Sequence, residues 1–129
     1  MLVMLAVVLS SCSSTDPYSF HYNELTDQTR VLRHTAGDST VVVRREPDGI
    51  SVAAAHFFTL DGEKIVRLDQ EEQYTFHIPA GQYVIGSLCK LPFSDITNEA
   101  SLNAQPGKTY IYRDFSVVGA GCSIAPMSR

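Results

Sequence analysis

The chain has 129 residues, a formal net charge of −4 and 44% hydrophobic residues, with three cysteines and no tryptophan. This length suffices for one domain with one modest core and leaves too few residues for a second domain. The chain has ten lysines and arginines and fourteen aspartates and glutamates. No basic stripe is therefore available to neutralise phosphates, and nucleic acid is not expected as a partner.

The first segment is apolar and short. Residues 2–9 are nearly all aliphatic, but roughly eight residues cover only about half of the ~20 that a membrane-spanning helix requires. A short apolar core closed by small residues is typical of a secretory signal. Here the core ends in Leu9-Ser10-Ser11 before Cys12, which resembles the lipobox of bacterial lipoproteins. We therefore expect residues 1–11 to be a cleaved lipoprotein signal and Cys12 to be lipidated, with acyl chains such as palmitate.

Two other interpretations of this segment remain open, because no Lys or Arg precedes the apolar run. They are an ordinary signal peptide with a cysteine nearby, and an apolar first turn of a cytosolic protein. In lipoproteins an Asp after the cysteine tends to retain the product at the inner membrane, so Ser13 favours the outer membrane. Two or more acyl chains anchor a protein stably. The resemblance thus implies a lipid-anchored outer-membrane protein whose domain faces the periplasm.

The two other cysteines, Cys89 and Cys122, form an even pair in a secreted context. Such a pair predicts one disulfide, with two buried free thiols as the alternative. Closing a loop of ~33 residues would stabilise the fold by roughly 3–4 kcal/mol on the chain-entropy estimate.

The chain changes character near residue 39. Residues 12–38 are rich in Ser, Thr, Asp and Asn without sustained periodicity, which predicts a flexible tether and an irregular arm, in which residues 19–25 are a candidate edge strand. From Thr40 onward, runs of β-branched and aromatic residues recur between turn signals. Residues 39–129 are therefore predicted to form the folded domain.

Turn signals divide this domain into short strands. Asp61-Gly62 predicts a two-residue hairpin, and the other signals are Pro47-Asp48-Gly49, Pro79-Ala80-Gly81 and Pro106-Gly107. The last predicted strand is residues 109–118. A weak helical pattern occurs over residues 93–102, where Ser94 is a candidate cap of one turn. The spacing predicts an all-β fold: a single small antiparallel β-sandwich of transthyretin or immunoglobulin-like type.

Alternation along three strands assigns their faces, because the side-chain period of a strand is two. Tyr74, Phe76 and Ile78 are predicted to face the core, with His77 on the other side. In the next two strands both faces carry apolar groups, as expected for central strands. Val84 and Leu88 oppose Tyr83, Ile85 and Cys89, and Tyr110 and Tyr112 oppose Ile111 and Phe115.

The order of these parts is similar to a family of short bacterial lipoproteins built on an uncharacterised small β-sandwich domain. The segments that carry the resemblance are "VVVRRE", "LDGEKIVRL", "YTFHIPAGQYVIG" and "PGKTYIYR". They extend over residues 41–115, about three fifths of the chain, and consist mostly of turns and strand patterns. The resemblance implies the sandwich architecture and an envelope location, and it brings no catalytic residues.

Catalytic and metal-binding motifs are not found in the sequence. Gly-x-Ser-x-Gly is missing, and the adjacent Glu71 and Glu72 are typical of a solvated turn. The four histidines lie in separate segments without metal-ligand spacing. His56 and His77 would approach one another if their strands paired, but we expect both to face solvent. The sequence therefore predicts no enzyme, no cofactor and no metal.

Three tyrosines are candidates for a contact surface. Tyr83, Tyr110 and Tyr112 combine apolar area with a polar tip, which is common at recognition surfaces. The alternative is core packing with the hydroxyls reaching the rim.

Together these observations predict a lipid-anchored, non-enzymatic binding or envelope-structural module with an unidentified protein or cell-wall partner. Alternatives are an assembly subunit of a secretion or surface machine that docks through an edge strand, an immunity or inhibitor lipoprotein, and a hydrolase with a dispersed site.

Overall fold

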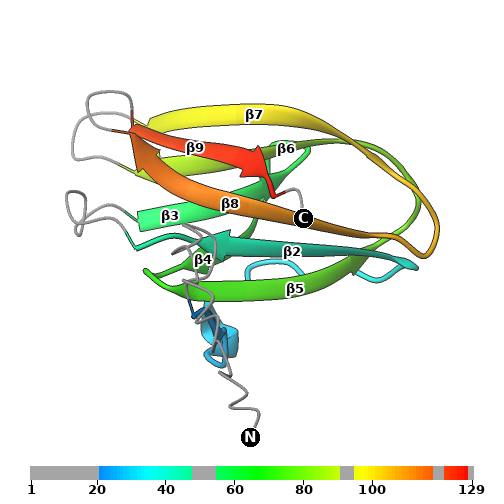
Figure 1. Ribbon diagram of the computed structural model, residues 1–129, viewed down its shortest axis with the longest axis horizontal. Coiled ribbons are helices and arrows are strands. Elements are labelled where there is room, and N and C mark those ends of the chain that lie inside the picture. Colours follow the sequence, from blue (N-terminus) through cyan, green and yellow to red (C-terminus); the bar gives the residue numbers. More distant parts are fainter. Residues whose placement is uncertain (1–20, 48–54, 91–94, 118–120, 128–129) are drawn as a thin grey trace, which may run out of the picture.

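Two β-sheets packed face to face make up the domain in the computed structural model, which describes residues 21–47, 55–90, 95–117 and 121–127. One sheet has five strands in the order β1-β5-β2-β8-β9, and the other has four in the order β4-β3-β6-β7 (Figure 1). The predicted β-sandwich is confirmed. The elements are β1 (Asn23–Glu24), η1 (Gln28–Arg30), β2 (Ser39–Arg45), β3 (Ala55–Leu60), β4 (Glu63–Leu68), β5 (Glu72–Ile78), β6 (Gly81–Lys90), β7 (Asp95–Ala104), β8 (Thr109–Val117) and β9 (Gly121–Pro126).

The strand pairs are antiparallel except at two places. β1 runs parallel to β5, and β2 runs parallel to β8. The β2–β8 pair lies in the middle of the five-stranded sheet, so its strands are joined through the second sheet rather than by a hairpin. In the described part of the chain no helix has the length and apolar character needed to span a membrane.

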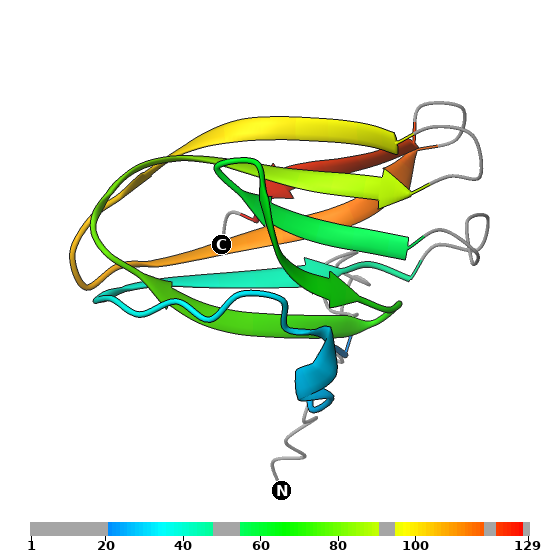
Figure 2. The ribbon, with the colours of Figure 1, turned by 180° about the vertical axis from the view of Figure 1, so that it is seen from behind.

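The predicted hairpin between β3 and β4 is confirmed. Asp61 and Gly62 connect the two strands with φ angles of +50° and +80°. Positive φ at both central residues is the geometry that matches the twist of a two-residue hairpin, and it favours an Asp-Gly pair. The turn signal at Pro79 marks a connection between the two sheets and not a hairpin, because β5 before it and β6 after it belong to different sheets (Figure 2).

Two predictions about the C-terminal half were wrong. The weak helical pattern over residues 93–102 falls in strand β7, whose whole length pairs with β6; Ser94 itself lies outside the described residues. In β7 the side chains of Leu102 and Ala104 are buried while those of Ser101 and Asn103 are exposed, and this alternation decides for a strand. The second error concerns the end of the fold, where residues 109–118 were predicted to be the last strand. A further strand of low β-propensity, β9, follows and pairs with β8.

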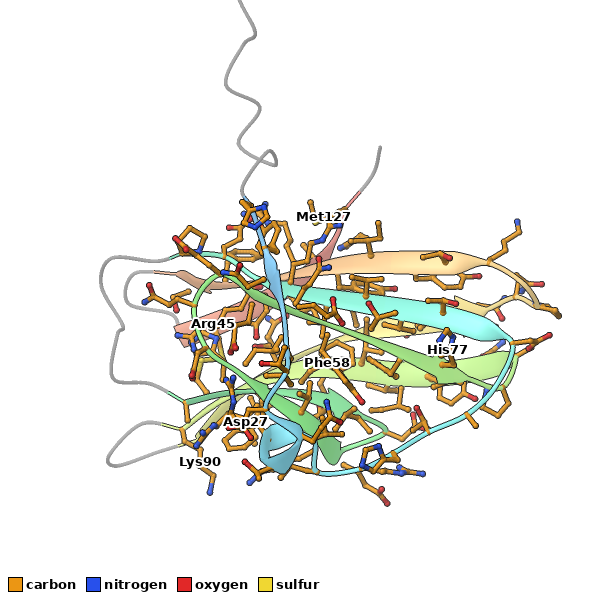
Figure 3. The ribbon with its side chains drawn as sticks, turned by 90° about the horizontal axis from the view of Figure 1, so that it is seen from below. Asp27, Arg45, Phe58, His77, Lys90 and Met127 are labelled. Atoms are coloured by element: carbon orange, nitrogen blue, oxygen red, sulfur yellow. A yellow bond between two sulfur atoms is a disulfide. The ribbon has the colours of Figure 1, made fainter. Side chains whose placement is uncertain are left out.

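The core lies between the sheets, with Phe58 fully buried at its centre (Figure 3). The predicted faces are confirmed: Phe76 and Ile78 are buried, and Tyr74 packs against the same cluster. Along β6, Ile85 is buried whereas Val84 on the other side is 40% exposed. Both β6 and β8 are interior strands of their sheets, as the apolar groups on both faces predicted.

The described part of the predicted tether and arm, residues 21–38, packs against the sandwich. Leu25 and Val31 are buried in the core. The backbone of β1 pairs with β5, and the N–H groups of Leu32 and Arg33 both donate to the carbonyl of Ile65 in β4. The arm thus covers one edge of each sheet, because the apolar side chains within its polar sequence anchor it there.

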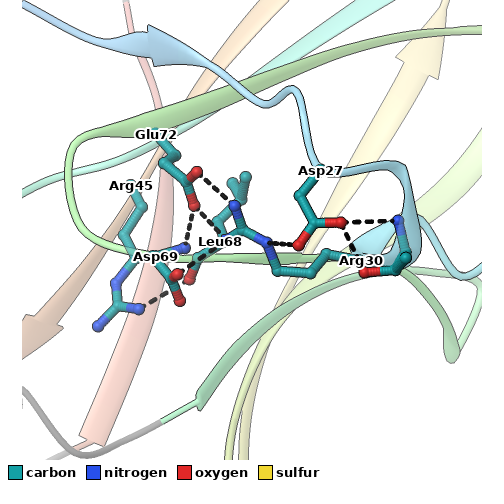
Figure 4. A network of polar contacts seen from close by, with 7 residues as sticks. Asp27, Arg30, Arg45, Leu68, Asp69 and Glu72 are labelled. Carbon is teal, nitrogen blue, oxygen red and sulfur yellow. Dashed lines mark hydrogen bonds and ion pairs between the residues drawn. The ribbon is translucent and has the colours of Figure 1, made fainter.

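A polar cluster fixes the arm beside β5 (Figure 4). The guanidinium of Arg30 makes a paired contact with the Glu72 carboxylate and lies 2.9 Å from an oxygen of Asp69. Asp27 caps η1 by accepting from the N–H of Thr29. Next to this cluster, the nearly buried Arg45 donates to the carbonyl of Leu68 at 2.7 Å.

Candidate functional site

The predicted disulfide is present between Cys89 and Cys122. Cys89 lies in β6 of the four-stranded sheet and Cys122 in β9 of the five-stranded sheet, with their Cα atoms 5.8 Å apart. Both residues are buried. The bridge therefore ties the two layers of the sandwich together. Cys12, the predicted lipidation site, lies outside the described residues.

The prediction that His56 faces solvent was wrong. His56 is completely buried in β3. His77, in contrast, is exposed in β5 of the other sheet (Figure 3). Because their strands lie in different sheets, the two histidines do not pair. The register of β3 on β6 instead places His56 directly opposite Cys89.

A buried polar network surrounds His56. Asp114 in β8 is completely buried, and its Oδ1 accepts from the Ser87 hydroxyl at 2.7 Å and lies 3.1 Å from Nδ1 of His56. The other ring nitrogen, Nε2, lies 3.5 Å from Sγ of Cys89 and 3.3 Å from Oγ of Ser116. Carboxylate, imidazole and sulfur are thus aligned in one chain of contacts. We call His56, Ser87, Cys89, Asp114, Ser116 and Cys122 the interior cluster.

The interior cluster includes a set of metal-ligand atoms. An imidazole nitrogen of His56 and the sulfurs of Cys89 and Cys122 all lie within 4.8 Å of one another. These atom types suit zinc and other thiophilic ions.

Sequence spacing gave no sign of this set, because His56 is 33 residues from Cys89 and Ser116 is opposite Cys122 only through the β8–β9 register. The available signal was alternation in β6, which places Ser87 and Cys89 on the same inward face as Ile85.

The order carboxylate, imidazole, hydroxyl along Asp114, His56 and Ser116 is that of a hydrolase triad. In a hydrolase the nucleophile must meet a substrate in a pocket. His56 and Asp114 are completely buried. The two described surface grooves are lined by residues outside the interior cluster. Neither groove supports a hydrolase, and the expected lack of enzyme activity stays a prediction.

The three tyrosines occupy different environments. Tyr112 belongs to the buried core, where burial and then the neighbouring Tyr110 raise the pKa of its hydroxyl. Tyr83 and Tyr110 are half-buried, and both hydroxyls bond to backbone: Tyr83 donates to Pro79, and Tyr110 accepts from the N–H of Gln105. This arrangement resembles the core-packing alternative. The contact surface itself stays a prediction.

At the margin opposite the arm, the four-stranded sheet ends in β7, which lies beside β9, the last strand of the five-stranded sheet (Figures 1 and 2). The N–H and carbonyl of Val84 both bond to Asp61 at the β3–β4 turn. Hydrogen-bonding direction alternates along a strand, so Ile85 faces β7 and its partner Ala100 faces β6. The intervening residues of β7 direct their backbone groups away from the sheet; they are Thr97, Glu99, Ser101 and Asn103.

Few of these outward groups take part in hydrogen bonds among the described residues. The carbonyl of Asn103 accepts from the Tyr110 hydroxyl at 3.2 Å. In the described part of the chain, no hydrogen bond reaches the outward backbone groups of Thr97, Glu99 and Ser101. An exposed row of unpaired N–H and carbonyl groups is the feature through which sheets add a strand from another chain.

Comparison of this chain with protein-family models, with curated proteins and with solved structures finds no match.

Proposed function

We propose that the chain is a lipid-anchored envelope module that binds an extended segment of another envelope protein along the outer edge of β7. The observation that carries this proposal is the asymmetry of the sheet edges. The arm covers an edge of each sheet, at β4 and β5, while the outward backbone groups from Thr97 to Ser101 in β7 have no hydrogen-bonding partner among the described residues. A strand added there gains main-chain hydrogen bonds.

The chemistry of the edge indicates the kind of segment that would fit. Its exposed side chains are polar, and Glu99 carries a negative charge with no Lys or Arg in the strand. Opposite charges across neighbouring strands are stabilising. The partner segment is therefore an extended stretch carrying Lys or Arg. The predicted acylation at Cys12 would serve the same function, because confinement to a membrane raises the effective concentration of the module near its partner.

The Ser101→Pro variant tests the edge. It removes the outward N–H without touching the ladder to β6, and proline is tolerated at such edge positions. A photo-crosslinking side chain at Thr97 in cells is expected to capture one envelope protein in the wild type and in the matched control Ser101→Thr, and not in Ser101→Pro. An equal adduct in Ser101→Pro, or no adduct in the wild type, contradicts strand addition.

The anchor has its own test. The Cys12→Ala variant is expected to leave the membrane fraction, because the acyl chains are then missing. Continued fractionation of Cys12→Ala with membranes contradicts the lipid anchor.

A further inference from the structure

We propose that reduction of the Cys89–Cys122 disulfide converts the interior cluster into a zinc site, with both sulfurs and Nε2 of His56 as ligands. The inference is independent of the proposed partner binding. It begins with the geometry: three ligand atoms from β3, β6 and β9 already lie within 4.8 Å of one another in the folded domain. Cys₂His is a donor set that zinc accepts, with a fourth position for water or an oxygen ligand.

The second observation is the orientation of the imidazole. The Asp114 carboxylate lies 3.1 Å from Nδ1 of His56, on the side away from the sulfurs. Metal-bound histidines commonly donate their other ring N–H to a carboxylate, which fixes the tautomer and turns the free nitrogen toward the metal. Asp114 is itself held by the Ser87 hydroxyl at 2.7 Å. Asp114 is thus a positioning residue, and Nε2 faces Cys89 as a ligand would.

A third observation concerns the fourth position. The Ser116 hydroxyl lies 3.3 Å from Nε2, and its residue is opposite Cys122 in the β8–β9 register. The Ser116 hydroxyl therefore lies next to the imidazole, on the residue that pairs with Cys122. Zinc completes a tetrahedron with one oxygen ligand of this kind.

The chemistry balances with an external dithiol as the reductant. The dithiol gives two electrons and two protons to the Cys89–Cys122 bond, which opens to two thiols, and the dithiol becomes a cyclic disulfide. Zinc then displaces both thiol protons and binds two thiolates. At Zn–S distances of about 2.3 Å in a tetrahedron the sulfurs lie roughly 3.7 Å apart, a separation that rotation of the two side chains must provide. The disulfide and the bound metal therefore exclude each other, because both use the sulfurs of Cys89 and Cys122.

Cobalt(II) is the probe, because a tetrahedral Co²⁺–thiolate site absorbs visibly and zinc then displaces the cobalt. The protein is reduced with dithiothreitol, desalted without oxygen and titrated with Co²⁺. We expect one Co²⁺ per chain with thiolate-to-metal charge transfer in the reduced protein and none in the oxidised protein. A reduced protein that takes up no Co²⁺, or that binds it without a thiolate band, overturns the proposal.

Variants separate a built site from metal binding by the two thiols alone. Asp114→Asn is expected to weaken zinc binding about 10–100-fold, and His56→Gln to weaken it more. His77→Ala, which changes an exposed histidine, is the matched control and leaves the affinity unchanged. Equal affinity in His56→Gln and wild type overturns the proposal. If reduction unfolds the domain, recovery of its near-UV circular dichroism on adding zinc supports the site, and no recovery overturns it.

Discussion

The strongest electrostatic contact at the arm is the pair of Arg30 and Glu72, whose side chains are 11% and 18% exposed. Burial alone would raise the pKa of the Glu72 carboxyl. The hydrogen bond from Arg30, the N–H of Asp69 and the Arg30 charge outweigh burial and lower that pKa below its ordinary value of 4.5. A folded-state pKa lower than the unfolded one stabilises the fold above the ordinary value. The stabilisation is lost as the pH falls through the lowered pKa.

Glu72→Gln is therefore expected to lower the free energy of unfolding at neutral pH by about 1.5–3 kcal/mol, the range for hydrogen bonds to charged groups. The difference from wild type should shrink below pH 4.5, where the unfolded carboxyl is already protonated. Urea unfolding at several pH values measures it. Glu63→Gln is the control: its pair with Arg33 is 65% and 46% exposed, so its cost stays below about 1 kcal/mol. Equal costs in the two variants would contradict the assignment.

Residue chemistry explains which parts of the candidate site were predictable. An even cysteine pair in a secreted context indicated the disulfide between Cys89 and Cys122, because redox compartment and count suffice for that inference. The neighbours of the bridge were not predictable. His56 and Asp114 meet only after β3 and β8 are placed in facing sheets, and no local pattern encodes which strands face each other.

At the scale of elements, turn chemistry and alternation predicted the central strands well. Positive φ at Asp61 and Gly62 is required by a two-residue hairpin, so the dipeptide identifies it. Propensity failed for β9, residues 121–126, where Gly, Ser, Ala and Pro are not strand formers. There the long-range pairing with β8 and the bridge at Cys122 decide the conformation.

The contribution of the N-terminal arm to the core could not be predicted from its composition, which is mostly polar. Leu25 is 4% exposed in the core, although it lies among polar residues. A Cβ on Gly37 would lie 2.0 Å from the backbone of Ile78, so the arm passes β5 in close contact. The arm thus contributes to the packing of both sheets while closing their edges.

Leu25→Ala is expected to cost about 2–5 kcal/mol of unfolding free energy, the range for a buried leucine reduced to alanine. Leu32→Ala gives a matched control in the same arm, because Leu32 is 51% exposed; its cost is expected to stay within about 0.5 kcal/mol. The midpoints of urea denaturation measure both. Two equally small costs would show that the arm does not form part of the core.

At the scale of the whole molecule, one covalent bond joins the two layers. The disulfide connects β6 and β9 across the sandwich and bridges a sequence separation of 33 residues. In the chain-entropy account the bridge restricts the unfolded chain more than the folded one, because the folded strands already hold the cysteines close together. The same sulfurs border the buried network of His56 and Asp114, so opening the bond changes the interior as well as the unfolded state.

The Cys89→Ala/Cys122→Ala double variant is expected to lose roughly 3–4 kcal/mol of unfolding free energy relative to the oxidised wild type. Its urea m-value should rise, because an unfolded chain without the bridge exposes more surface. Urea denaturation gives both quantities, and the reduced wild type without metal serves as a control that keeps the sulfur atoms. If the double variant and the oxidised protein have the same m-value and midpoint, the bridge does not restrict the unfolded chain. The layers would then be held together by burial of their apolar faces alone.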